Sequence, residues 1–377
     1  MAITRITTAN AIPDSSVNNV KMANIVQSKN ILINGNMSVA QRSTSASSIT
    51  SGGYHACDRW KEDMTSAGTW TISQSTTVPT GQGFATSLKM DCTTANGSLS
   101  ANSELMVQQR IEGRNLQYLK KGTSSAESTT LSFWVRSNKT GTYICELQDV
   151  DNTRQISKSY TISVADTWEK KTITFPGDTT GALDNNSDRS LDCSFYLAAG
   201  SDLSSGTLST TWTAKTDANR AVGQVNLADS TSNEWYITGA QLETGDTASE
   251  FEFLPFDVTF NKCHRYCLIL GDAPGGTIYN YADDGVIGHY YNTTDFYPNF
   301  FFPVPMRSTP GVSFSTTGSG LGDVSSQNTA KTGTSAGTNA TSATNINFRV
   351  STSSATQGSG GAFNFAANDY VILSAEL

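Results

Sequence analysis

The chain has 377 residues, which is enough for two or three domains with cores of their own. Only 15% of the residues are charged and the formal net charge is −8, so neither a nucleic acid nor an anionic membrane is an expected partner. Serine, threonine, asparagine and glycine dominate the polar residues. Because such a composition suits short strands and turns better than helices, we expect an all-β protein.

Residues 1–29 form a separable N-terminal segment. Asp14, followed by Val17, Val20 and Ile25, predicts a short capped helix with too few apolar groups to be stable alone. The segment therefore needs a partner surface, and a frayed terminus is the alternative interpretation. It lacks the charged-then-apolar order of a secretion signal, and no segment of the chain has the apolar length that spans a bilayer. We expect the product to stay in the cytoplasm that makes it.

Residues 30–254 predict a β-sandwich. Apolar and polar residues alternate along several short runs, of which Leu131, Phe133 and Val135 are one clear case. Similar runs lie at 70–72, 88–92, 104–110, 143–147, 171–175 and 193–197. The connections between them are rich in turn-forming residues, which argues against a parallel sheet with crossover helices. About eight or more short strands with such turns predict a jelly roll or a related two-sheet sandwich.

The stretch from Glu234 to Pro255 predicts the strand that closes this sandwich. Its first half alternates around Trp235 and is dense in β-forming residues. Gly239 lies within the strand, where the missing side chain allows a bulge or a close crossing. Gly245 and Asp246 predict the turn that ends the strand.

Residues 255–377 predict a smaller C-terminal β domain. Phe256, Phe260 and Cys263 have helical spacing, so we expect a short helix from Asp257 to bridge the two domains before a further strand.

A polar tract at 315–345 interrupts this domain. It consists almost wholly of Ser, Thr, Gly, Ala and Asn, and it cannot bury a core of its own. Strand patterns return after it, so the tract lies inside the domain. We expect either a solvent-exposed loop or a segment interleaved with neighbouring subunits.

No convincing catalytic constellation is present, so we expect no enzyme activity. The match of 333–337 to the G-x-S-x-G nucleophile elbow lies in the polar tract, without a preceding apolar strand or a following helix, and we interpret it as a coincidence. His55, His264 and His289 are not paired at metal-ligand spacing. A glycosidase needs only two carboxylates, however, so the residues alone leave a glycan depolymerase open.

We expect no cofactor and no catalytic metal. Two oxygen-rich turns, at 149–152 and 184–188, leave a structural calcium ion open, although the first lacks the glycine and terminal glutamate of an EF-hand loop. The six cysteines show no C-x-x-C spacing, and several fall on apolar faces, so we predict reduced and buried thiols.

Aromatic residues cluster between 279 and 302, interspersed with Asn, Asp and His. Aromatic faces stack on sugar rings while such polar groups reach hydroxyls, and the mixture is also typical of subunit surfaces. The candidates for glycan or subunit contact are Tyr279, Tyr281, His289, Tyr290, Tyr291 and Tyr297. Trp134 is a further candidate because it points away from the apolar face of its strand. The alternative for Trp134 is a second buried face or a subunit contact.

Several spaced motifs resemble the virion-surface and tail-fibre proteins of tailed bacteriophages, which carry a jelly roll like that of carbohydrate-binding modules. The opening and closing motifs are NILINGNMSVAQR at 30–42, C-DRW at 57–60 and GAQLETG with FE at 239–252. The central strands and the domain junction are LSFWVR at 131–136, TWEKKTITFPGDTT at 167–180 and KCHRY at 262–266. Met37 and Cys267 stand where this family usually has aromatic residues.

This resemblance implies a non-enzymatic structural protein of a tailed-bacteriophage virion, a tail fibre or another surface appendage, made in the host bacterial cytoplasm. It implies attachment to host-surface polysaccharide or lipopolysaccharide, contacts with other virion proteins, and a homotrimer. The N-terminal segment resembles docking segments of phage fibres. Its candidate docking contacts are Ile12, Val17, Val20 and Ile25. Open alternatives are a head decoration, capsid or neck protein without a receptor role, and a glycan depolymerase.

Overall fold

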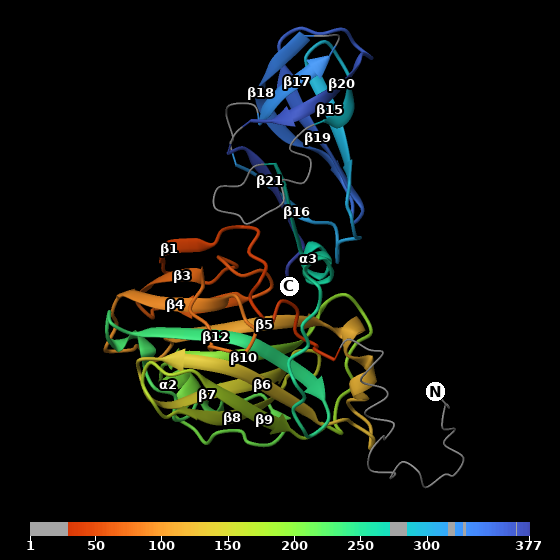
Figure 1. Ribbon diagram of the computed structural model, residues 1–377. Helices are drawn as coiled ribbons and strands as arrows, with labels where there is room; N and C mark the ends of the chain where they lie inside the picture. Colours follow the sequence, from red (N-terminus) through yellow and green to blue (C-terminus); the bar gives the residue numbers. More distant parts are fainter. Residues whose placement is uncertain (1–28, 272–284, 316–320, 327–328, 367) are drawn as a thin grey trace, which may run out of the picture.

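The computed structural model describes residues 29–271, 285–315, 321–326, 329–366 and 368–377. In Figure 1 a broad two-sheet sandwich is followed by the short helix α3 (Phe256–His264), and a smaller β part lies beyond this helix. The predicted all-β fold, with a jelly-roll sandwich joined by a short helix to a smaller β part, is confirmed. The predicted docking segment, with Ile12, Val17, Val20 and Ile25, lies outside the described residues.

Each layer of the sandwich is an antiparallel sheet of six strands. The first sheet runs in the order β1-β3-β4-β12-β6-β9. Its strands are β1 (Ser45–Ile49), β3 (Thr69–Ser75), β4 (Ser87–Thr94), β12 (Glu234–Thr244), β6 (Thr129–Ser137) and β9 (Glu169–Phe175). The second sheet runs in the order β11-β8-β7-β10-β5-β2. Its strands are β11 (Thr213–Ala214), β8 (Arg154–Ile162), β7 (Gly141–Asp149), β10 (Arg189–Ala199), β5 (Glu104–Glu112) and β2 (Lys61–Thr65).

Short helical turns lie in the connections of the sandwich. They are α2 (Ser201–Ser204) and the 3-10 turns η1 (Gly113–Asn115), η2 (Gln117–Leu119), η3 (Asp217–Asn219) and η4 (Leu227–Asp229). The chain passes repeatedly from one sheet to the other, so the apolar face of each sheet packs on that of its partner.

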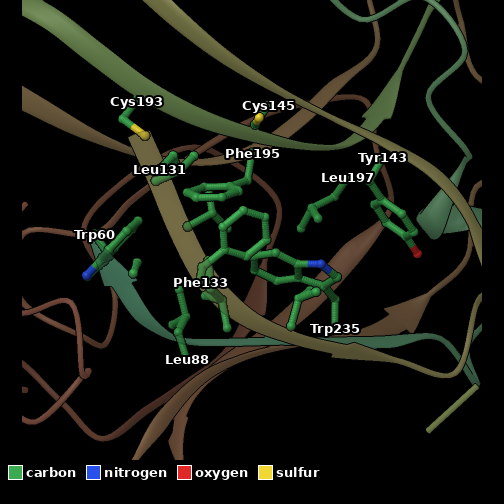
Figure 2. Close-up of a cluster of buried hydrophobic side chains, with 14 of the residues drawn as sticks. Trp60, Leu88, Leu131, Phe133, Tyr143, Cys145, Cys193, Phe195, Leu197 and Trp235 are labelled. Atoms are coloured by element: carbon green, nitrogen blue, oxygen red, sulfur yellow. The ribbon is translucent and has the colours of Figure 1, made fainter. Parts of the chain in front are cut away.

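Large aromatic side chains fill the space between the two sheets. Phe195 of β10 lies in the middle of the cluster in Figure 2, and its ring centroid is 6.2 Å from Trp60, 5.0 Å from Phe133 and 6.2 Å from Trp235. All four rings are fully buried. Because each such ring buries about 150 to 250 Å² of surface, this cluster dominates the stability of the sandwich.

The segment 30–42 lies beside β12, and its motif residues explain why. The side-chain amide of Asn30 donates to the Ala240 carbonyl oxygen at 2.9 Å, and its oxygen accepts from Leu242 N at 3.1 Å. Gly35 passes so close to β12 that a Cβ at this position would lie 2.0 Å from the Ala240 oxygen. The opening and closing motifs of the sequence therefore form two halves of one hydrogen-bonded contact.

Gly239 interrupts β12 at a bulge. Its φ is +62°, and the pairing with β6 shifts register between Thr238 and Gln241. The ring of Phe84 lies over it, so that a Cβ on Gly239 would be 2.5 Å from the ring. The predicted bulge and close crossing are both present. Only glycine can adopt this positive φ and also leave room for the ring of Phe84.

Beyond α3 the chain forms a three-stranded sheet, in the order β13-β21-β16, and a closed barrel, in the order β14-β15-β19-β18-β17-β20. The sheet strands are β13 (Cys267–Gly271), β16 (Gly311–Phe314) and β21 (Tyr370–Ser374). The barrel strands are β14 (Val286–Tyr290), β15 (Asp295–Phe301), β17 (Gly322–Ser326), β18 (Thr329–Thr341), β19 (Asn345–Thr352) and β20 (Gly360–Phe365). One apolar cluster, which includes Phe296, Phe348 and Phe363, extends through both.

Where it is described, the polar tract belongs to the barrel. Leu321 and Val324 are fully buried and Ala336 packs against the core, whereas many side chains of β18 face solvent. The backbone of β18 pairs with β17 on one side and β19 on the other. These residues therefore do not form a solvent loop, because strands of the same chain pair with β18 on both sides.

Polar contacts join the sandwich to the C-terminal part. Arg59 pairs with Glu376, and its Cζ lies 3.5 Å from the ring centroid of Tyr266. Arg265 donates to both carboxylate oxygens of Glu112, at 2.8 and 2.7 Å. In Figure 1 the C-terminal end of the trace lies beside α3, between the two parts. The last residues of the chain thus take part in the junction.

All six cysteines are free and buried, as predicted. Burial raises the pKa of the Cys193 thiol well above its usual value, so the reactive thiolate is disfavoured. Within the described ranges, no helix is long and apolar enough to cross a membrane.

Candidate functional site

Three neighbouring strands of the barrel present an aromatic face. We define the barrel face as the outward side chains of β14, β15 and β19 and of the hairpin that joins β14 to β15. They are Ile287, His289, Tyr291, Tyr297, Asn299, Phe301, Asn347 and Arg349. Ile287, Tyr291 and Phe301 are 76%, 63% and 71% exposed. His289 pairs with Tyr297 across the strands, and the rings of Tyr291 and Tyr297 meet edge to face at 5.5 Å.

The hairpin holds Tyr291 in place. The side-chain oxygen of Asn292 accepts from the backbone N–H groups of Thr294 and Asp295, both at 2.7 Å. The amide of Asn292 donates to the Asp295 carboxylate at 2.8 Å, and this hydrogen bond lowers the pKa of Asp295 below its usual value. Tyr291 N donates to the Asp295 carbonyl at 2.9 Å. The backbone that carries the exposed ring is therefore held by a closed turn.

The prediction that Tyr290 belongs to this surface is wrong. Its side chain is fully buried in the barrel, where the ring packs on Phe296 at 5.1 Å and the hydroxyl lies 3.0 Å from Thr352 Oγ1. Successive residues of a strand point to opposite faces, so its two chain neighbours are outside while Tyr290 is inside. Tyr279 and Tyr281 lie outside the described residues.

Trp134 lies half-buried on the outer face of the first sheet, opposite Thr238 and Lys170 in the strand pairing. The nearby Tyr236 is only 5% exposed, and Arg136 Cζ lies 4.9 Å from its ring centroid. Because Tyr236 is covered in this way, this part of the sandwich offers less open aromatic surface than the barrel face.

The fold also forms a groove between the sandwich and α3, which the sequence patterns do not reveal. Its volume is about 270 Å³, and its lining includes Ile31, Ile33, Asn115, Tyr118, Lys262 and Arg265. These residues come from the opening segment, from the turns η1 and η2, and from the end of α3. No spacing rule connects three such distant segments, so only the tertiary structure brings them together.

The histidines have three different environments. His55 Nδ1 lies 2.8 Å from Glu62 Oε2, and this glutamate is completely buried. His264 is buried against Phe260, and burial lowers its pKa to about 4, so it is neutral at pH 7. His289 lies on the barrel face. The described contacts of these histidines assemble no nucleophile, base and orienting acid in one place.

The nucleophile-elbow match lies inside a strand. Residues 333–337 belong to β18 and pair with β19 on one side. An elbow requires a sharp turn from a strand into a helix, which is absent at these residues. The match therefore reflects the composition of the polar tract.

The two oxygen-rich turns meet, and a lysine ammonium lies against one carboxylate of the first turn, Asp149. Asp184 N donates to the Asp151 carboxylate at 2.9 Å. Lys121 Nζ pairs with Asp149 and with Asp178, the latter at 2.9 Å, and donates to two backbone carbonyls at 3.2 and 3.1 Å. In the described part of the chain, no group of three or more His, Cys, Asp or Glu side chains is placed to hold a metal. Lys121 therefore supplies a positive charge beside Asp149.

No family model and no curated protein matches the sequence. Among solved structures, the enzymatically active domain of tailspike protein 4 from bacteriophage CBA120 is 13% identical with a TM-score of 0.30, over 53% of this chain and 21% of that one. This chain thus spans about a fifth of that structure.

Two carbohydrate-binding modules are similarly distant. TmCBM61 in complex with β-1,4-galactotriose is 10% identical with a TM-score of 0.30, over 58% of this chain and 100% of the module. A C-terminal family 22 module of Clostridium thermocellum is 12% identical with a TM-score of 0.28, over 51% of this chain and 89% of the module. These likenesses are too distant to assign a function.

Proposed function

We propose that this chain is a non-enzymatic structural protein on the surface of a tailed-bacteriophage virion, a tail fibre or a similar appendage, and that its barrel face attaches to host-surface polysaccharide or lipopolysaccharide. The bacteriophage origin rests on the spaced sequence motifs. The motif residues Asn30 and Gly35 hold the fold together and lie outside the barrel face. The attachment role needs a separate argument.

The pair formed by the exposed Tyr291 and the half-buried Tyr297 carries that argument. Sugar rings bind to aromatic faces, and their hydroxyls bind to amide, imidazole and guanidinium groups. The barrel face offers both kinds of group side by side, with His289 opposite Tyr297 and with Asn347 opposite Asn299 in the strand pairing. The hairpin fixes the backbone of Tyr291 before any ligand arrives, so little backbone entropy is lost on binding.

Homotrimeric assembly and docking to other virion proteins remain part of the proposal through the resemblance. The polar tract does not add to the case for a trimer, because β18 obtains its hydrogen bonds within one chain.

The test is binding of the purified chain to polysaccharide and lipopolysaccharide isolated from a panel of bacteria. Replacement of Tyr291 by alanine removes an exposed ring, and we expect about a tenfold loss of affinity, which corresponds to about 1.4 kcal/mol. Phe253→Ala is the matched control, because this ring is 51% exposed but lies on the sandwich. Its affinity should equal that of the unsubstituted protein.

Unchanged affinity in Tyr291→Ala would reject the barrel face as the attachment surface. Release of reducing sugar from a bound polysaccharide would replace the non-enzymatic proposal with a depolymerase.

A further inference from the structure

A buried lysine lies between two buried aspartates at one end of the sandwich. Lys121 follows η2, Asp149 is the last residue of β7, and Asp178 follows β9. Their side chains are 6%, 0% and 3% exposed. Lys121 Nζ contacts the Asp149 carboxylate and lies 2.9 Å from Asp178 Oδ2. The fold thus holds an amine against a carboxyl group where water is largely excluded, which greatly raises the effective concentration of one group at the other.

The turn after β7 prepares Asp149 to be attacked by an amine. The backbone N–H of Asn152 donates to Asp149 Oδ1 at 3.0 Å, and the Asn152 side-chain amide donates to the same oxygen at 3.2 Å. Lys121 contacts the other oxygen, Oδ2. When an amine attacks a carboxyl carbon, negative charge develops on an oxygen, and N–H donors already aimed at that oxygen stabilise the intermediate. Asn152 therefore supplies an oxyanion hole for Asp149 Oδ1.

Asp178 is placed to move protons. The Arg154 guanidinium donates to both of its carboxylate oxygens, at 2.7 and 3.1 Å. Burial alone would raise the pKa of Asp178, but the hydrogen bonds from Arg154 and Lys121 hold this pKa below its usual value. Asp178 is therefore a carboxylate at neutral pH, and it can accept a proton from the Lys121 nitrogen and pass it on.

A small cavity lies beside the lysine. It is lined by Lys121, Asp178, Leu147 and Trp212, among others, and its volume is about 20 Å³. The ring centroid of Trp212 is 5.1 Å from Lys121 Nζ. Since about 10 to 15 Å³ is enough for one water molecule, a water molecule released at Lys121 has a space to enter.

We propose that Lys121 and Asp149 form an intramolecular isopeptide bond. One proton passes from the Lys121 ammonium to the Asp149 carboxylate, and the neutral amine then attacks Asp149 Cγ. The C–N bond forms, a second proton moves from the nitrogen through Asp178 to the leaving oxygen, and the C–O bond breaks. In sum, an ammonium and a carboxylate become an amide and one water molecule, and Asp178 is regenerated. No oxidant or other reactant is needed.

The bond links the end of β7 to the turn after η2 and encloses β6 and β7 in a covalent loop. Like a disulfide, such a link restricts the unfolded chain and so stabilises the folded one. It does so in a chain whose six cysteines are all free. The proposal does not depend on glycan binding or on a virion origin.

Intact-mass spectrometry of the purified full chain tests the proposal. The measured mass should be lower than the mass calculated from the sequence by one water molecule, whereas Lys121→Arg should have its calculated mass. Lys120→Arg is the matched control, because Lys120 is exposed and pairs with Glu127, and it should keep the loss of water. After proteolytic digestion, one branched peptide should contain both Lys121 and Asp149.

Two further variants test the chemistry. Asp149→Asn should release ammonia in place of water and give the same amide, so its mass should equal that of the cross-linked unsubstituted protein. Asp178→Asn cannot accept the proton, and a smaller fraction of it should be cross-linked at the same time after synthesis. An equal fraction would overturn the role of Asp178.

The proposal as a whole is overturned if the unsubstituted chain has its calculated mass, or if Lys121→Arg still loses water. The mass of the unsubstituted chain and its branched peptide decide the question even where a variant does not fold. Tyr291→Ala should keep the loss of water, so failure of the barrel face as an attachment surface and failure of the isopeptide bond are separate results.

Discussion

The sandwich and the barrel are both all-β, but different forces hold their strands. The sandwich has a broad core of large side chains, and all six tryptophans of the chain lie between residues 60 and 235. The barrel has a smaller core of phenylalanine, valine and leucine side chains, to which β18, its longest strand, contributes little more than Ala336. The barrel therefore depends more on pairing between neighbouring strands.

This difference teaches that a strand needs no hydrophobic pattern of its own when both neighbours are already anchored. On one side of β18, β17 carries the buried Val324, and on the other, β19 carries Ile346, Phe348 and Val350. Closure of the barrel then removes free edges, so even a run of Ser, Thr and Gly satisfies its backbone hydrogen bonds.

The largest expected effect is in the sandwich core. Phe195→Ala leaves a cavity among Trp60, Phe133 and Trp235, and we expect a loss of about 3 to 5 kcal/mol in the free energy of unfolding. Urea unfolding followed by tryptophan fluorescence measures it, and reports on the sandwich alone because no tryptophan lies elsewhere in the chain. Val164→Ala, at a 55% exposed position, should change little. A loss below about 1 kcal/mol for Phe195→Ala would mean that the neighbouring side chains repack and fill the cavity, which a rigid, close-packed core would not allow.

The next effect is at Lys121. Lys121→Met leaves the fully buried Asp149 without its cation, and we expect a loss of about 3 kcal/mol. The substitution also removes a hydrogen-bond donor of Asp178. Burial alone would raise the pKa of Asp178, but hydrogen bonds from Arg154 and Lys121 hold this pKa below its usual value. Thermal unfolding measures the change.

Lys120→Met is the control for this variant. Lys120 is largely exposed and pairs with an exposed glutamate, so its loss should cost under about 1 kcal/mol. A chelator should leave the Tm of the unsubstituted protein unchanged. A large drop in Tm with the chelator would show instead that a metal ion supports the fold.

The smallest effects are expected in the polar tract. Leu321→Ala should cost about 2 kcal/mol, because Leu321 is fully buried in the barrel core. Thr332→Ala, at an exposed position of β18, should stay within about 0.5 kcal/mol. Far-UV circular dichroism follows both, and tryptophan fluorescence should be unaffected by either. Equal effects of the two substitutions would contradict the view that a few buried anchors order the tract.

The sequence by itself determined the frame of this protein. Alternation in the runs that became β6, β7, β9 and β10, with turn residues between them, specified short antiparallel strands, and the helical spacing before Cys263 specified α3. Gly239 marked the bulge in the sequence, because the bulge requires a residue with a positive φ and no side chain, and both are local properties. Such features depend on neighbours along the chain, so they can be derived from it.

Only the tertiary structure decided where the candidate sites are. Tyr290 and Tyr291 have the same side chain and adjacent positions, and the pairing of β14 with its neighbours places one in the core and the other at the surface. Lys121 fills a space among oxygens contributed by loops about 30 to 60 residues away in the chain, and the groove collects side chains from three separate segments. These arrangements arise from strand register and packing, which act between residues distant in sequence and leave no periodic trace in it.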